Sequence, residues 1–206
     1  MIESEPIGKQ QAKSQRARRS LCEATVACLV RDGYAETSLN RVAALANLSK
    51  GALQHHFSTK EDLMVATANF LLQRPFETPE HAGEVPHSVA DYIKLTWHKL
   101  VNTEGYRALL EILVAARTDR MLQTRLSDTL LTWNDALNEQ ARGKFTSKLG
   151  YEQDVEILMT MTRSLMRGLV IQDQYSEDPA LAIQYIDRWI ELISPLLELK
   201  STAERL

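Results

Sequence analysis

Two short helical patterns lie close together between residues 33 and 60, and this spacing constrains the fold more than any other feature of the chain. Thr37 and Ser38 carry hydroxyls that can accept from the unpaired backbone N–H groups at the start of a helix near Leu39. The apolar residues of that first helix recur at spacings of three and four: Leu39, Val42, Ala43 and Ala46. Because the stripe is lined by small residues, it predicts a helix that another helix can approach closely.

A turn and a second short helix follow. Asn47 lies where the chain must turn, and asparagine tolerates the left-handed backbone conformation better than most other residues. Ser49 is the expected N-cap of the next helix, which carries Leu53 and Phe57 on its inner side. Its outer side presents Lys50, Ala52, Gln54 and His55. We therefore predict a short, partly basic face that stays exposed.

From about Arg19 to Leu72 the sequence resembles the tetracycline-repressor-like (TetR) family of transcriptional regulators. The resemblance is carried by Gly33-Tyr34, Thr37-Ser38, Ser49-Lys50-Gly51, His56-Phe57 and Thr59-Lys60-Glu61. It implies an all-α fold, with an N-terminal three-helix helix-turn-helix DNA-binding head and a larger C-terminal helical ligand-binding and dimerisation domain. We expect a flexible tail over residues 1–14, the head over 15–72 and the second domain over 73–206.

Two residues depart from the family pattern. Asn47 stands where the family usually has glycine, and Gln54 stands where it usually has an aromatic residue, commonly tyrosine. The first change suits the same backbone conformation. The second replaces a ring by an amide that can pair with the N6 and N7 edge of adenine, so we expect an unusual base preference.

Charge is unevenly distributed along the 206 residues, whose net charge is −3. Residues 1–60 hold nine Lys or Arg and five Asp or Glu, a net charge of +4, which leaves −7 for the remainder. The amino-terminal part therefore suits phosphates and the rest repels them. Lys13, Arg16, Arg18 and Arg19 lie where the expected tail meets the first helix, and a solvated leader is favoured there over an arm that reaches into a DNA groove.

The resemblance implies which residues meet DNA. Phosphate contacts are expected from Ser38, Ser49, His55 and Lys60, and the base edges are expected to face Lys50, Gly51, Ala52 and Gln54. For Lys60 the alternative is a solvated lysine at a helix start. A metal site at His55 and His56 is not expected, because neighbouring helical residues point about 100° apart.

Helical patterns continue to the end of the chain, and no strand pattern is found. A first helix is expected to end before Gly33, and a fourth to run from Thr59 to Arg74-Pro75, followed by a helix-breaking linker over residues 73–88. The later patterns cover residues 88–102, 105–118, 119–144, 152–175 and 179–200. Pro195 is expected to kink the last of them.

The last two patterns are amphipathic, and resemblance to the family implies that they pair with a second copy of the chain. The expected dimer-interface residues are Ile157, Met161, Leu165, Leu169, Tyr185, Trp189, Ile193 and Leu196. Burial within one subunit is the alternative, because a core stripe and an interface stripe look alike in sequence. A small-molecule effector pocket is expected among large or adaptable side chains: Trp97, Met121, Trp133, Met159, Met161 and Met166. Plain core packing is the alternative for each.

Other functions are less favoured. The sequence has no nucleophile elbow, phosphate loop or metal-spaced cluster, so we expect neither enzymatic activity nor a cofactor. No apolar run reaches the roughly 18 residues that span a bilayer, so a cytoplasmic protein without membrane contact is expected. Cys22 and Cys28 are expected to be reduced packing residues. The expected function is a DNA-binding transcriptional regulator that binds a palindromic operator as a homodimer and is released by an effector. A helical adaptor without specific DNA binding is the alternative.

Overall fold

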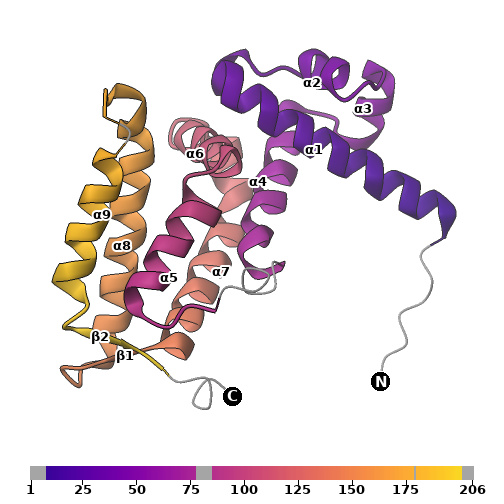
Figure 1. Ribbon diagram of the computed structural model, residues 1–206. Coiled ribbons are helices and arrows are strands. Elements are labelled where there is room, and N and C mark those ends of the chain that lie inside the picture. The colour runs from indigo at the N-terminus through magenta and orange to yellow at the C-terminus, as the bar shows by residue number, and fades with distance from the viewer. Residues whose placement is uncertain (1–7, 78–84, 179, 201–206) are drawn as a thin grey trace. The chain divides into compact units, whose positions relative to one another are not determined.

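The computed structural model describes residues 8–77, 85–178 and 180–200, and these are predominantly helical (Figure 1). They form two compact units. Unit 1 holds the described residues of Met1–Arg74 and Arg107–Ser127, and unit 2 holds those of Pro75–Tyr106 and Asp128–Leu206. The divisions fall inside helices α4 (Lys60–Glu77), α6 (Glu104–Ala116) and α7 (Arg120–Lys144), so each of these helices contributes residues to both units.

Unit 1 begins with helix α1 (Lys9–Glu36), which is interrupted at Gly33 by a left-handed φ of 75°. The regular helical geometry is therefore broken where the sequence predicted the end of the helix, although helical residues continue to Glu36. Glycine adopts this left-handed conformation without strain. Its start differs from the prediction, because residues 9–14 are helical and do not belong to a flexible tail. The rest of that expected tail, residues 1–7, lies outside the described residues.

Helices α2 (Leu39–Leu45), α3 (Lys50–His56) and α4 (Lys60–Glu77) complete the head. Ser38 caps α2 as predicted, whereas the hydroxyl of Thr37 is buried and donates to the carbonyl of Gly33 at 2.7 Å. Thr59 and Asp62 cap α4 reciprocally, each side chain accepting from the other residue's N–H. Helix α4 continues through Pro75 to Glu77, so the expected start of the helix-breaking linker at residue 73 is wrong: Pro75 lies in the last turn, where it interrupts little of the helix. Residues 78–84 of that expected linker lie outside the described residues.

The core of unit 1 confirms the predicted inner faces. Leu53 of α3 and Phe57, which follows its last residue, are buried against the inner sides of α1, α2 and α4. The other buried members of this cluster are Leu21, Cys22, Ala24, Cys28, Val42, Ala43 and Leu63. Cys22 and Cys28 are free thiols inside it, and burial raises the pKa of each.

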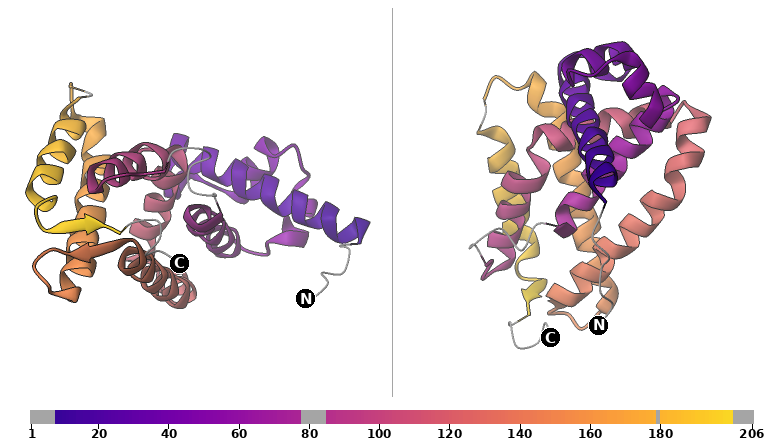
Figure 2. Two further views of the ribbon diagram at one scale, coloured as in Figure 1. Left: turned by 60° about the horizontal axis from the view of Figure 1, so that its bottom comes forward. Right: turned by 90° about the vertical axis from the view of Figure 1, so that its right-hand side faces the viewer.

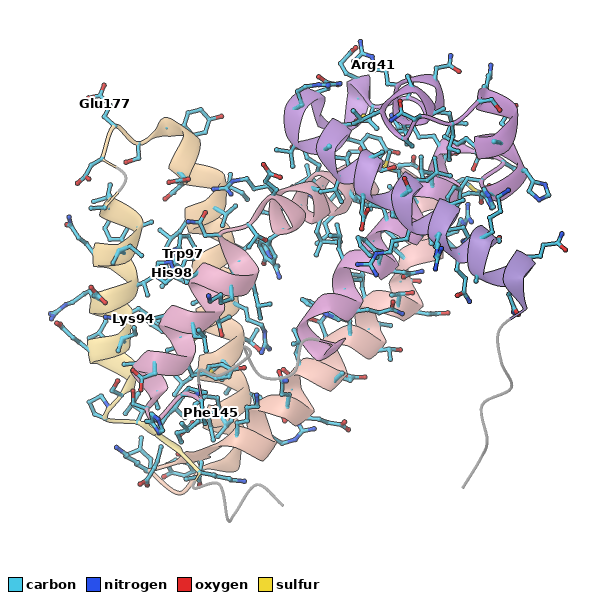
Figure 3. The ribbon with its side chains drawn as sticks, turned by 45° about the vertical axis from the view of Figure 1, so that its right-hand side comes forward. Arg41, Lys94, Trp97, His98, Phe145 and Glu177 are labelled. Atoms are coloured by element: carbon cyan, nitrogen blue, oxygen red, sulfur yellow. The ribbon has the colours of Figure 1, made fainter. Side chains whose placement is uncertain are left out.

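Unit 2 contains helix α5 (Val89–Thr96), the π-helical segment η2 (Trp97–Val101), the parts of α6 and α7 assigned to it, α8 (Glu152–Gln172), the short 3₁₀ segment η3 (Asp173–Tyr175) and α9 (Leu181–Ile193). Ser88 caps α5 through the N–H of Asp91. The widened turn of η2 is closed by a bond from the N–H of Asn102 to the carbonyl of Trp97 at 2.8 Å. Figure 3 shows Lys94 on α5, whose ammonium pairs with Asp187 of α9 at 2.8 Å.

Unit 2 also contains a two-stranded antiparallel sheet that the sequence did not predict (Figure 2). Strand β1 (Phe145–Ser147) pairs with β2 (Leu197–Leu199), with Phe145 opposite Leu199. Phe145 and Leu197 are buried, and the Phe145 ring meets the Tyr92 ring edge to face at 5.0 Å. The expected helix over residues 179–200 is therefore wrong in its last part: α9 ends at Ile193, and Pro195 lies beyond the helix instead of kinking it.

Candidate nucleic-acid interface

The face predicted to read DNA is exposed on α3. The hydroxyl of Ser49 accepts from the N–H of Ala52 at 3.1 Å, which starts the helix at Lys50 as predicted. Leu53 is completely buried on the inner side. On the outer side Lys50, Gly51, Gln54 and His55 are exposed and Ala52 is half-buried. The burial of one side of a two-turn helix therefore sets the direction in which the polar side chains project.

The turn before α3 has the conformation predicted for Asn47. Its φ is +54°, and no other residue except glycine has a positive φ in the described part of the chain. The next N–H, that of Leu48, donates to the carbonyl of Ala43 at 2.9 Å, so the end of α2 is closed by the turn itself. The angle between α2 and α3 thus depends on one left-handed asparagine.

Arg18 holds the other end of α3 in place, a role that the sequence did not reveal. Its guanidinium lies 4.5 Å from the centroid of the Phe57 ring, and its Nη1 donates to the carbonyl of His56 at 3.2 Å. A cation near a helix C-terminus interacts favourably with the terminal carbonyls. The two residues are 38 positions apart, so no local pattern could have indicated the contact.

Two of the residues expected at phosphates keep a donor available. Ser38 and Ser49 accept backbone N–H groups at the starts of α2 and α3, at 3.4 and 3.1 Å. An accepting hydroxyl still carries its own O–H, which can donate to a phosphate oxygen. Helix starts also favour negative charge. The geometry is compatible with the expected role of both serines.

Lys60 has a structural role besides the expected one. Its ammonium donates to the carbonyls of Tyr34 at 2.6 Å and Ala35 at 3.4 Å, and lies 4.2 Å from the centroid of the Tyr34 ring. Burial lowers the pKa of this amine below its ordinary value. Since an ammonium group has three donors, one remains for a phosphate. Phosphate contact by Lys60 therefore stays a prediction, and its capping of the end of α1 is an observation.

Glu111 of α6 meets the same end of α1 within unit 1. Its carboxylate accepts from the backbone N–H of Tyr34 at 2.9 Å. A side chain at Gly33 would bring its Cβ to 3.3 Å from this carboxylate, in addition to the strain of a φ of 75°. The end of α1 is thus held by Lys60 on its carbonyls and by Glu111 on an N–H group. Glu111 is a further residue that sequence reasoning missed.

The comparison with known families agrees with this geometry. Residues 21–67, which include α2, α3 and the buried part of α1, match the model described as bacterial regulatory proteins of the tetR family. Over these residues the chain is similar to TetR-family regulators. The chain is a DNA-binding transcriptional regulator.

Similarity to known regulators extends beyond the head. An uncharacterised helix-turn-helix transcriptional regulator of Mycobacterium bovis is 28% identical over 191 residues, which cover 89% of this chain and 98% of the relative. The transcriptional repressor AcnR of Corynebacterium diphtheriae is 24% identical, covering 74% of this chain and 78% of AcnR. The fold of a transcriptional regulator from Rhodococcus sp. Rha1 matches with a TM-score of 0.67 and 20% identity, covering 87% and 97% of the two chains.

The structure does not bring all six expected pocket residues together. Trp97, Met159 and Met166 are buried in unit 2, and Trp133 is half-buried there. Met121 belongs to unit 1 and is 67% exposed, so its inclusion in the pocket is wrong. Met161 is 48% exposed on α8, on the same side as Ile157, which makes it a surface residue of the subunit.

The expected dimer residues differ in burial and fall into three groups. Ile157, Met161 and Tyr185 are exposed apolar residues, and Leu165, Trp189 and Leu196 are half-buried. Leu169 and Ile193 are buried within the subunit and belong to its core, because they point to the inner sides of α8 and α9. Ile171 and Leu192 are further apolar residues that are exposed on the same two helices.

Metal-ligating clusters and membrane-spanning helices are both absent from the part of the chain that the structure describes. Over residues 8–77, 85–178 and 180–200 there is no group of three His, Cys, Asp or Glu side chains that could hold a metal ion. Among the same residues no helix is long and apolar enough to cross a membrane.

His56 gives the head a predicted pH dependence. Burial lowers its pKa below the ordinary 6.5, and the charges of His55 and Arg18 act in the same direction. The unfolded chain therefore binds a proton at higher pH than the folded chain does. We expect this group to leave the free energy of unfolding unchanged above pH 6.5, and to lower it as the pH falls from 6.5 through the lowered pKa.

Urea denaturation between about pH 5 and pH 8 measures this effect. His56→Gln should flatten the acid limb of the stability profile, whereas His98→Gln, at an exposed position of η2, should leave it as in the wild type. An unchanged acid limb in His56→Gln would show that other groups cause the loss of stability.

Proposed function

We propose that this regulator is a repressor that binds a palindromic operator as a homodimer and leaves it when a small molecule binds to unit 2. The observation that carries the proposal is the exposed outer side of α3, with Lys50, Gly51, Gln54 and His55, on a helix whose other side is fully buried. A helix of this kind can enter the major groove while its inner residues hold it on the head.

The side chains of the head support a division of labour on DNA. Ser38, Ser49, His55 and Lys60 are proposed to contact phosphates, which fix the position of the head without reading sequence. Lys50, Gly51, Ala52 and Gln54 are proposed to face base edges, where a glutamine amide pairs with adenine. The net charge of +4 over residues 1–60 favours the approach of this part of the chain to DNA.

The exposed apolar residues of unit 2 support dimerisation through α8 and α9. Ile157, Met161, Tyr185 and Leu192 are each about half exposed, and apolar residues gathered on one surface mark interaction sites. A two-fold dimer would place two recognition helices in successive major grooves about 34 Å apart. The operator is therefore proposed to be an inverted repeat.

Release by a small molecule requires that it bind the two conformations of the regulator unequally. Similar solved structures support an effector of this kind: one of a transcriptional regulator from Saccharomonospora viridis contains choline, and one of the multidrug-binding protein EbrR contains imidazole. The name of AcnR supports repression as the direction of regulation.

Selection from a random duplex pool tests the proposed function. We expect the wild-type protein to enrich an inverted repeat whose half-sites are centred about 10 base pairs apart, with affinity that falls steeply with salt. Enrichment of no sequence by a folded protein would favour the helical adaptor. Enrichment of a single unrepeated site would contradict the palindromic operator and its binding by a homodimer, but not sequence-specific DNA binding.

A further inference from the structure

Arg163 of α8 is a half-buried guanidinium whose hydrogen-bond partners are neutral. Its Nη2 donates to Oδ1 of Asn138 on α7 and to Oγ1 of Thr160, both at 2.7 Å. No carboxylate in the described part of the chain lies within ion-pairing distance of it. By contrast, Arg142 of α7 pairs with Glu156 of α8. Between α7 and α8, Arg142 thus has a carboxylate partner, whereas Arg163 has only neutral partners among the described residues.

A second arginine lies one helical turn further along the same side of α8. Arg167 is half-buried, and its Nε lies 3.5 Å from the hydroxyl of Tyr106, at the outer limit of a hydrogen bond. The described residues provide it with no carboxylate either. Burial is the largest cause that lowers the pKa of Arg163 below its ordinary value, and the charge of Arg167 acts in the same direction. The charge of Glu156, whose carboxylate is paired with Arg142, opposes them. Arginine nevertheless remains protonated, so two positive charges share this part of unit 2.

Two neighbouring cations that form no ion pair with a described carboxylate are costly in a partly buried position, and an anion placed between them would offset that cost. Arg163 has donors on Nε and Nη1 beyond those used on Asn138 and Thr160. Arg167 has donors beyond the weak one to Tyr106. These are the fork-shaped donors that bind carboxylate, sulfonate and phosphate oxygens in pairs.

We propose that Arg163 and Arg167 form the anion-binding end of the effector site, and that the effector is an organic anion with an apolar body. The inference rests on the proposed function, in which a small molecule binds unit 2. Arg163 is pre-oriented by Asn138 and Thr160, so it can receive the anion without reorganising. The buried Trp97, Met159 and Met166 are the apolar residues of unit 2 that would accompany it.

A matched pair of fluorescent probes tests this chemistry. 8-Anilinonaphthalene-1-sulfonate carries a sulfonate on the same aromatic body as the neutral N-phenyl-1-naphthylamine. We expect Arg163→Gln and Arg167→Gln each to weaken binding of the sulfonate at least about tenfold, because each removes charged hydrogen bonds. Binding of the neutral probe should stay within about twofold of the wild type for both variants.

Two further variants separate this role from a purely structural one. Arg188→Gln removes an exposed arginine of α9 that pairs with Glu191, and should leave both probes unaffected. Arg163→Lys keeps the charge without the fork and should bind the sulfonate with intermediate affinity. Circular dichroism melting shows whether each variant is folded, and Arg167→Gln, which loses only a long contact, tests the proposal even if Arg163→Gln unfolds.

The outcomes distinguish this inference from the proposed function. The anion site would be overturned if the Arg163 and Arg167 variants lose affinity for both probes equally. It would also be overturned if Arg188→Gln weakens binding of the sulfonate as much as they do. Sequence-specific DNA binding without probe should be the same in Arg167→Gln and the wild type. If the wild type binds its selected duplex but neither arginine affects the sulfonate, the inference alone fails. If it selects no duplex, the proposed function fails whatever the probes show.

Discussion

Ile157→Asp is expected to convert the dimer to a monomer and to weaken operator binding at least about 100-fold. Ile157 is 54% exposed on α8 and is one of the apolar residues proposed for the dimer interface. A carboxylate there would have to be buried without a partner when two copies meet. Without the dimer, the second head no longer binds at the high effective concentration that the first one provides.

Sedimentation equilibrium and fluorescence anisotropy with the selected duplex measure the two effects. The matched control is Leu131→Asp, which places the same charge at a 63% exposed leucine of α7 in unit 2. The control should remain dimeric and bind DNA as the wild type does. If the Ile157→Asp variant remains dimeric, the interface does not include this part of α8. If the wild type is monomeric and still binds an inverted repeat tightly, operator binding does not require a dimer.

Leu53→Ala is expected to lower the free energy of unfolding of unit 1 by about 2–5 kcal/mol, the cost of deleting a fully buried leucine side chain. Leu53 is completely buried where α3 meets α1, α2 and α4. A helix of seven residues has little stability of its own, so its position depends on this burial. Specific DNA binding should therefore be lost at temperatures where the wild-type head is folded.

Urea denaturation followed by circular dichroism measures the loss of stability, and anisotropy measures binding. Leu45→Ala is the control, because Leu45 is 44% exposed at the end of α2 and its truncation should change stability by about 0.5 kcal/mol or less. Equal effects of the two substitutions would contradict the anchoring of α3 by its inner side.

The head could be predicted from sequence because its determinants are local. Ser38, Asn47 and Ser49 each act on backbone groups within a few residues, so capping and turn chemistry gave the bounds of α2 and α3. The end of unit 2 could not be predicted in the same way. Strand β2 forms because it pairs with β1, about 50 positions earlier in the chain, and such short strands carry no periodicity of their own.

The candidate sites show the same limit. Leu169 and Ile193 share the helical spacing of Ile157 and Met161, yet the first two are core residues and the last two are exposed. Apolar residues at helical spacing indicate a helix, but they do not indicate which side of that helix the rest of the subunit covers. The contact of Arg18 with Phe57, like that of Glu111 with Tyr34, joins residues far apart in sequence, so no local pattern indicates it.

The most direct test of the central claim, that the outer side of α3 reads base pairs, compares the sequences selected by Gln54→Ala and Lys60→Ala from one random duplex pool. Gln54→Ala should change the preference at one or two base pairs of each half-site and leave the rest of the motif intact. Lys60→Ala should select the wild-type motif, with weaker binding to every sequence and a flatter salt dependence at equal folded fraction. If Gln54→Ala selects the wild-type motif unchanged, or if both variants weaken every sequence alike, the outer side of α3 does not read the operator.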